Sequence, residues 1–183
     1  MPNWCYNTIN IEGPREELDK FVEKAKSKDK DVAPSDRSLS FQNFLPSPTG
    51  EWEYNWCVEN WGTKWDARYP NLEDGGGSDI MYSFDTAWSP PTPVVTKMIY
   101  DFPKLRFSLY YEEPGCNFQG ELEGYNGEIE KDECIEYHPE CMECGFRDYP
   151  VDLCEYDTDE IGFLCPKCYI ETYESKDWDD DRN

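Results

Sequence analysis

Hydrophobic residues recur at every second position in several short segments of the first 130 residues. The clearest segment is DIMYSFDTAW (79–88), where this alternation predicts a half-buried strand. One face of that strand is expected to carry Ile80, Tyr82, Phe84 and Trp88, and the other Ser83, Asp85 and Ala87. LRFSLYYEE (105–113) alternates in the same way through Leu105, Phe107, Leu109 and Tyr111. Two further strands are predicted at NWCYNTINI (3–11) and at SLSFQNFL (38–45), which ends before Pro46.

Two other segments repeat their apolar residues at helical spacing. PREELDKFVEKAK (14–26) begins with a proline, which suits the first turn of a helix, and SPPTPVVTKMIYDF (89–102) follows the strand at 79–88. The inward faces are expected to hold Leu18, Phe21, Val22 and Ala25 in the first helix and Val94, Val95, Met98, Ile99 and Phe102 in the second. NFQGELEGYNGEIE (117–130) is typical of a hairpin, because Asn126-Gly127 suits a type I′ turn.

The resulting order is strand, helix, strand, repeated once. That order predicts an α+β fold of the ferredoxin-like, split βαβ kind, with helices on one face of the sheet. A tryptophan-rich insert from Pro46 to Ser78 separates the halves. We therefore expect a ferredoxin-like domain at residues 1–130, a small module at 131–175 and an acidic disordered tail at 176–183.

The insert places Trp52, Trp56, Trp61 and Trp65 within fourteen residues. Rings of this kind stack on bases in single-strand binding proteins, but there they are accompanied by basic residues. Here Lys64 and Arg68 are outnumbered by acids, so packing of the rings into the core is the favoured interpretation. An exposed aromatic contact for a protein partner is the alternative.

Acidic residues dominate the chain, whose 40 acids and 17 bases give a net charge of -23. Residues 121–183 hold 21 acids and 5 bases, a balance of -16, and six of the nine cysteines. Direct binding to a nucleic acid backbone is therefore not expected, and a basic partner is. The sequence shows no 18-residue apolar run and no charged-then-apolar leader, so we expect a cytoplasmic protein with reduced cysteines.

Two CxxC pairs stand in the acidic third of the chain, and their spacing predicts a zinc site. Twenty residues separate Cys141 and Cys144 from Cys165 and Cys168. Each pair can point two thiolates at one ion, and two pairs complete a tetrahedron. A module of the zinc-ribbon or treble-clef kind is favoured over an iron–sulfur cluster, a redox CxxC or a disulfide framework.

Three further groups lie near these pairs: Cys134, His138 and Cys154. They could exchange with a ligand, but small buried roles for the two cysteines and an exposed role for the histidine are favoured. Since the chain has one histidine, catalytic sets that need one have few ways to form. We therefore expect no catalytic residues and no enzyme activity.

Four segments resemble a known family: MPNWCYNTINIEGP, NWCVENWGTKWDA, FDTAWSPPTPV and YYEEPGCNFQGE. They are similar to the YubB ferredoxin-like proteins of phages and plasmids, a domain family of unknown function, over about residues 1–130. The resemblance implies a ferredoxin-like fold and an origin on a mobile genetic element. It carries over no catalytic residues, and it does not cover the cysteine-rich tail.

These observations favour a non-enzymatic, acidic interaction protein that inhibits a host defence system of the CRISPR or restriction type. Its carboxylates would occupy a basic groove as DNA does, and its partner would be a basic, nucleic-acid-binding host protein. One alternative is an enzyme or binder of a nucleotide or small-molecule signal, with the tryptophan insert as pocket and Asp85 or Cys57 as reactive group. Another is a zinc-stabilised phage or plasmid accessory protein with a different protein partner. The exposed hairpin edge at 117–130 could pair with a second copy, although the sequence does not set the oligomeric state.

Overall fold

The computed structural model describes residues 2–147, 155–157 and 162–171 of the 183-residue chain. The chain divides into two compact units, Met1–Ile135 and Glu136–Asn183, and each is described by itself. The boundary predicted at residue 130 lies inside the last strand of the first unit, and the predicted tail at 176–183 lies outside the described residues.

The first unit contains a six-stranded sheet. Its strands are β1 (Trp4–Glu12), β2 (Arg68–Glu73), β3 (Asp79–Ala87), β4 (Arg106–Glu113), β5 (Phe118–Tyr125) and β6 (Glu128–Glu136). Its α-helices are α1 (Arg15–Ala25), α2 (Tyr54–Trp61) and α3 (Thr92–Asp101). Three short 3₁₀ helices lie between these elements: η1 (Pro34–Asp36), η2 (Phe41–Asn43) and η3 (Pro114–Cys116).

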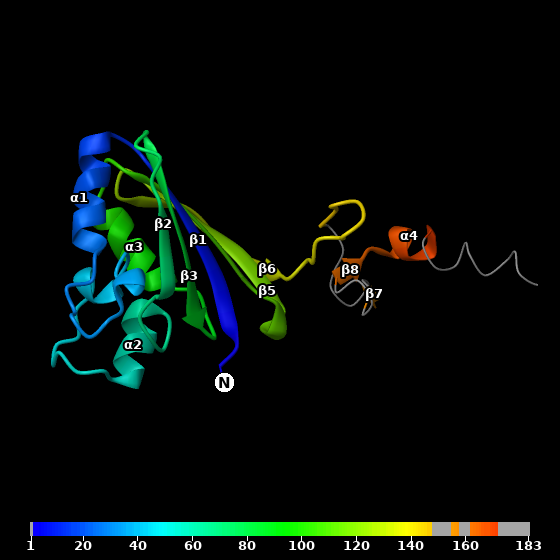
Figure 1. Cartoon of the computed structure of the whole chain (residues 1–183), viewed down its shortest axis with the longest axis horizontal. Helices are drawn as coiled ribbons and strands as arrows, with labels where there is room; N and C mark the ends of the chain where they lie inside the picture. Colours follow the sequence, from blue (N-terminus) through cyan, green and yellow to red (C-terminus); the bar gives the residue numbers. More distant parts are fainter. Residues whose placement is uncertain (1, 148–154, 158–161, 172–183) are drawn as a thin grey trace, which may run out of the picture. The chain divides into compact units, whose positions relative to one another are not determined.

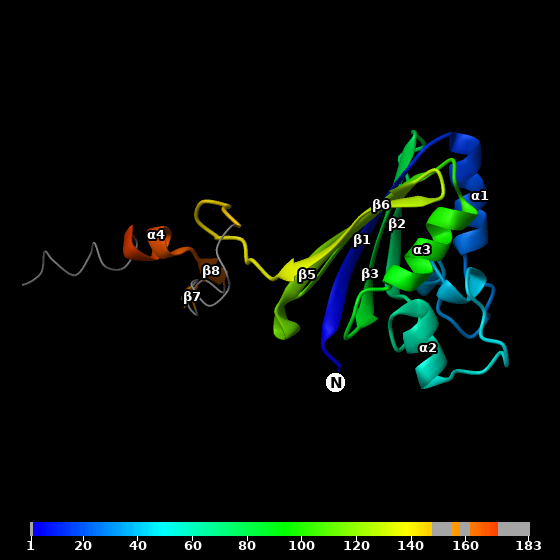
Figure 2. The ribbon, with the colours of Figure 1, turned by 180° about the vertical axis from the view of Figure 1, so that it is seen from behind.

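The strand order β2-β3-β1-β4-β5-β6 is that of a ferredoxin-like sheet extended by one hairpin. Strand β1 lies between β3 and β4 and is antiparallel to both, while α1 joins β1 to β2 and α3 joins β3 to β4. Figures 1 and 2 show α1 and α3 on the same face of the sheet. The predicted α+β, ferredoxin-like fold is confirmed, and the opposite face carries none of the described helices of this unit.

Alternation in the strands builds the core between this sheet and its helices. In β1 the buried positions are Cys5, Asn7, Ile9 and Ile11. The alternate residues Tyr6, Thr8 and Asn10 lie on the opposite face of the sheet, called the open face below. The helices contribute Leu18, Phe21 and Ala25 from α1 and Val94, Val95, Met98 and Ile99 from α3, all fully buried. Val22 and Phe102 pack at the margin of the core, so the predicted inward faces of both helices are confirmed.

The strand predicted at 38–45 is wrong. This segment instead forms η2, and its apolar side chains Leu39, Phe41 and Phe44 enter the core from a turn. The Asp66 carboxylate accepts hydrogen bonds from the Ser40 hydroxyl at 2.7 Å and from the Phe41 N–H at 2.6 Å. Because that N–H is satisfied by a side chain, it is not available to a strand ladder. Strand β2, inside the predicted insert, occupies this place in the fold.

The end of β3 also differs from the alternation pattern. Thr86 keeps the inward position that the alternation gives it, and its hydroxyl donates to the Ser89 carbonyl at 2.8 Å. Trp88 then adopts a φ of 72° and is 47% exposed, so its predicted place in the apolar row is wrong. Ala87, expected on the open face, is buried instead, and the buried Thr63 side chain exchanges two hydrogen bonds with its backbone.

The tryptophan insert divides into buried and exposed rings. Trp61 is buried and donates its indole N–H to the Leu45 carbonyl at 2.9 Å, and Trp56 packs edge-on against it at 5.5 Å. Trp52 and Trp65 are 56% and 37% exposed. Core packing therefore accounts for only half of these rings.

The predicted hairpin joins β5 to β6. Asn126 and Gly127 both have positive φ, 55° and 75°, as a type I′ turn requires. Strand β6 pairs with β5 alone within the sheet, so it forms one edge, and β2 forms the other.

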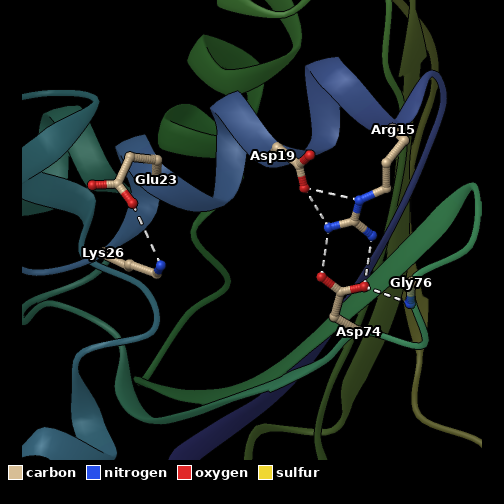
Figure 3. Close-up of polar contacts among 6 residues, drawn as sticks. All are labelled: Arg15, Asp19, Glu23, Lys26, Asp74 and Gly76. Carbon is tan, nitrogen blue, oxygen red and sulfur yellow. Dashed lines mark hydrogen bonds and ion pairs between the residues drawn. The ribbon is translucent and has the colours of Figure 1, made fainter.

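An ion-pair network fixes the start of α1 to the loop between β2 and β3 (Figure 3). Arg15 binds both carboxylate oxygens of Asp74, at 2.6 and 2.7 Å, and also contacts Asp19 on its own helix. Asp74 accepts the Gly76 N–H at 2.8 Å, which orders the glycine-rich end of the insert. The Glu23–Lys26 pair in the same view is exposed, with 3.4 Å between its charged atoms.

The described part of the second unit is small. It contains β7 (Glu155–Asp157), β8 (Gly162–Leu164) and the short helix α4 (Pro166–Tyr169), with β7 and β8 antiparallel. Among the helices of either unit that the structure describes, none has the length and apolar character needed to cross a bilayer.

Candidate metal centre

The first CxxC pair lies in a tight turn at the start of the second unit. The Gly145 N–H donates to the Cys141 carbonyl at 2.8 Å, and the Cys141 N–H donates to the Phe146 carbonyl at 3.0 Å. Gly145 has a φ of 71°, in the left-handed region that favours glycine. The residue after the second cysteine therefore allows the chain to reverse while both thiols point to the same side.

The second pair is placed by a strand followed by a helix. Leu164 ends β8, Cys165 precedes α4, and Pro166 occupies the first helical position, where its missing N–H costs no hydrogen bond. The Tyr169 N–H donates to the Cys165 carbonyl at 2.9 Å. One helical turn thus brings Cys168 back beside Cys165.

Backbone contacts join the two pairs. Cys141 forms a parallel bridge with Phe163, and the Met142 N–H donates to the Phe163 carbonyl at 2.9 Å. Leu164 is buried in the same small cluster as three of the cysteines, with Tyr169 packed against it. Turn, strand and helix therefore hold the sulfurs together, and the apolar cluster that the described residues form around them is small.

The four predicted ligands converge. The sulfurs of Cys141, Cys144, Cys165 and Cys168 all lie within 4.8 Å of one another, and those of Cys144 and Cys165 are 3.9 Å apart. A tetrahedral site with metal–sulfur bonds of about 2.3 Å has sulfur–sulfur edges of roughly 3.8 Å. These four cysteines can therefore hold one metal ion.

Burial and hydrogen bonding act differently on the four thiols. Burial raises the pKa of Cys141, but backbone N–H groups, including that of Cys165, outweigh it and lower that pKa to about 6. The pKa of Cys168 is raised, first by its hydrogen bond with Cys165 and then by burial. Thiolates this close repel one another, so a cation between them favours the fully ionised set.

Cys134 and His138 do not join this cluster. Cys134 is exposed on β6 in the first unit, so the buried role predicted for it is wrong. His138 is half-buried rather than exposed, and Cys154 lies outside the described residues. The eight described cysteines are all free thiols, so none of them forms the disulfide framework considered as an alternative.

The residues suggested as reactive groups lie apart from any shared pocket. Cys57 is fully buried in the core, where burial raises the pKa of its thiol. Asp85 lies on the open face of the sheet. A hollow of about 510 Å³ borders Trp4, Trp65, Leu39 and Ala67, but neither Asp85 nor Cys57 lines it.

The outward positions of β1 and β4 form a further candidate site that no sequence motif marks. Tyr6, Tyr110 and Glu112 line a second hollow, on the open face of the sheet. The alternation that predicts the core also predicts that these residues lie on the other face of the sheet, because they stand between the buried positions.

Comparison with known proteins matches half of the chain to a family. Residues 60–152 match the family described as the ferredoxin-like domain in Api92-like protein. The match includes Cys141 and Cys144, so the family extends past the expected limit at about residue 130 into the cysteine-rich tail, and it ends before Cys165 and Cys168. The second CxxC pair therefore lies outside the matched region.

One curated relative is the uncharacterized protein YubB of Escherichia coli strain K12, 31% identical over 77 residues. The match covers 42% of this chain and 53% of YubB, so the chain spans about half the length of that relative. The crystal structure of a protein api92 from Yersinia pseudotuberculosis superimposes with a TM-score of 0.60, covering 75% of this chain and 98% of that one. At 8% identity, this likeness supports the fold alone. The resemblance seen in the sequence is confirmed, and the chain belongs to the family of Api92-like proteins with a ferredoxin-like domain.

Proposed function

We propose that the protein is a non-enzymatic, acidic binding protein whose second unit is stabilised by a structural zinc ion. The observation that carries this proposal is the convergence of four cysteine sulfurs within 4.8 Å. Four thiolates complete a tetrahedral site and leave no position for a water or a substrate. A metal bound there stabilises structure rather than activating a nucleophile.

Zinc is favoured over other ions that thiolates bind. Two CxxC turns separated by twenty residues are typical of structural zinc sites, whose ligand sets are frequently four cysteines. Among the residues around the sulfurs whose burial the structure describes, few apolar side chains are buried. Such a module gains most of its folding free energy from the metal.

The partner is proposed to be a basic host protein that binds nucleic acid. A net charge of -23 favours association with a positive surface, and residues 121–183 alone contribute -16. Proteins that handle nucleic acids carry such surfaces in their grooves. The narrower form of the proposal is a host defence nuclease or CRISPR effector, supported by this charge and by the resemblance to mobile-element proteins.

Affinity capture followed by a salt titration tests this role. The full chain, purified with zinc, should retain a basic, nucleic-acid-binding protein from a bacterial lysate at low salt. Binding of the purified partner, measured by calorimetry, should weaken at least about tenfold between 50 and 200 mM salt, and double-stranded DNA should compete. Affinity that is insensitive to salt, or a captured partner without a basic surface, would contradict the proposal. The Cys165→Ser variant shows whether the folded second unit takes part.

A second candidate function is binding of a small planar ligand, favoured by the hollow of about 510 Å³ in the first unit. The Trp4 and Trp65 rings lie 6.1 Å apart at its border, and Arg68 stacks over Trp4 at 4.2 Å. A thermal-shift screen with nucleotides tests this candidate. A shift that is lost in Trp65→Ala would support it, and no shift with any nucleotide would exclude this ligand class.

A further inference from the structure

Strand register places a tyrosine between two carboxylates on the open face of the sheet. Tyr6 of β1 is directly opposite Asp85 of β3 on one side and Glu112 of β4 on the other. Side chains at directly opposed positions in antiparallel strands lie about 4.5–5.5 Å apart at their Cβ atoms. Arg68 of β2 extends the same row beyond Asp85.

A hollow of about 230 Å³ lies over this row. Tyr6, Asp85 and Glu112 line this hollow, and so do Thr8, Tyr69 and Tyr110. Tyr6 and Tyr69 are both more than half exposed, so their rings are available to a ligand. Tyr110 donates its hydroxyl to Glu112 at 3.0 Å, which fixes one carboxylate at the wall of the hollow.

The hollow combines negative charge with aromatic surface. Asp85 is half-buried, and it forms no ion pair with any other described residue. Burial raises the pKa of its carboxyl, and the nearby Arg68 charge offsets this only in part. A cation in the hollow would neutralise a carboxylate that the fold has partly removed from water.

The same sheet face already pairs guanidinium groups with aromatic rings. Arg68 lies 4.2 Å from the Trp4 ring centre and 4.3 Å from that of Tyr69, and Arg106 lies 4.8 Å from that of Tyr125. Guanidinium groups stack on aromatic faces and match carboxylates with a planar fork of donors. The ring-and-carboxylate chemistry at Tyr6 is of the same kind.

We propose that this hollow, defined by Tyr6, Asp85 and Glu112, binds an arginine side chain of the basic protein partner. The inference rests on the proposed function, because it names one anchoring contact of that partner. Single-stranded nucleic acid, which binds aromatic residues on related sheets, does not fit, since the two carboxylates would repel its phosphates.

Calorimetry of the full chain with a hexa-arginine peptide tests this contact. Tyr6→Ala removes the ring without changing the charge, and Asp85→Asn removes one charge with little change in shape. Each should weaken binding of the peptide by about fivefold to tenfold. Tyr100→Ala on α3 and Glu59→Gln on α2 are matched controls, since both residues are exposed and lie on helices. These controls should change the affinity by less than about twofold.

The outcomes separate this inference from the wider proposal. The Tyr6→Ala substitution should reduce the affinity for hexa-lysine less than the affinity for hexa-arginine, because an ammonium group stacks less well on the ring. Equal losses in the site variants and their controls would show only diffuse charge attraction and would overturn the arginine site. The same follows if the captured partner binds Tyr6→Ala and Asp85→Asn as tightly as the unaltered chain, although the proposed function would then stand. Binding of a single-stranded oligonucleotide that Tyr6→Ala abolishes would also overturn it.

Discussion

Phe107 shows how single side chains hold the first unit together. Strand β4 presents it to the helices opposite Ile11 of β1, and it is fully buried. Its ring lies 5.6 Å from that of Phe21 on α1, at an angle of 64°. One residue therefore connects the sheet to the helical layer by edge-to-face packing.

Replacing Phe107 with Ala should lower the free energy of unfolding of the first unit by about 3–5 kcal/mol, through lost burial and the cavity left behind. Urea denaturation followed by tryptophan fluorescence measures this, because six of the seven tryptophans lie in the first unit. Tyr100→Ala, at an exposed aromatic residue of α3, should change it little. A cost for Phe107→Ala no larger than that of the control would contradict the described core.

Asp74 should make the stability of the first unit depend on pH. Its hydrogen bonds with Arg15 lower the pKa of its carboxyl to about 2, below the ordinary value of 3.8. A group with a lowered folded-state pKa stabilises the protein above its unfolded-state pKa, and this contribution is lost as the pH falls. The difference in denaturation midpoint between the unaltered chain and Asp74→Asn should therefore be constant above about pH 5 and decrease from about pH 4 toward pH 2.

Glu23→Gln is the control for this prediction, because the Glu23–Lys26 pair is exposed. Exposed pairs contribute little, so this variant should follow the unaltered chain at every pH. A pH-independent difference for Asp74→Asn would show that the ion pair with Arg15 does not hold the loop.

At the scale of whole elements, strands β1, β3 and β4, helices α1 and α3 and the β5–β6 turn could be predicted because each has a local signal. Strand β2 could not. It contains Pro70, shifts register between Arg68 and Asn71, and has Tyr69 at a φ of 50°, so it shows no clean alternation. A strand at a sheet edge tolerates these features. The competing segment at 38–45 is held in a turn by Asp66, a contact made about 25 residues away that no local pattern reveals.

The candidate sites follow the same division. The metal ligands could be predicted because CxxC spacing is local, and the structure brings all four sulfurs together. The hollow at Tyr6 could not, since it depends on which residues of β3 and β4 stand opposite β1. Register between strands distant in sequence is decided by the packing of the whole sheet.

The folding of the second unit should depend on its metal ion, while the folding of the first unit should not. Cys165→Ser removes one of four ligands, so the variant should lose zinc and hydrogen-exchange protection across the described residues 136–147 and 162–171. The first unit should keep its unfolding transition, because its core shares no residue with the cysteine cluster. Cys134→Ser, at an exposed cysteine outside the cluster, should retain both zinc and protection. Loss of protection in both units of Cys165→Ser would contradict their independence.

The whole molecule combines two features. One is a ferredoxin-like unit with a sheet face on which none of its described helices packs, and the other is a small unit whose four described CxxC sulfurs converge. Most of the negative charge lies from residue 121 onward, in the last strands of the first unit and in the cysteine-rich unit. An ion that fixes the fold of the second unit would also fix the position of its share of this charge. The binding role proposed above therefore depends on whether that ion is present.

Native mass spectrometry with elemental analysis, on protein purified without chelator, measures most directly whether the four cysteines hold a zinc ion. We predict one zinc ion per chain, retained by Cys134→Ser and lost from Cys144→Ser and Cys165→Ser. A second unit that is well folded without metal, or a protein that carries iron and sulfide in place of zinc, would contradict the claim that a structural zinc ion stabilises this unit.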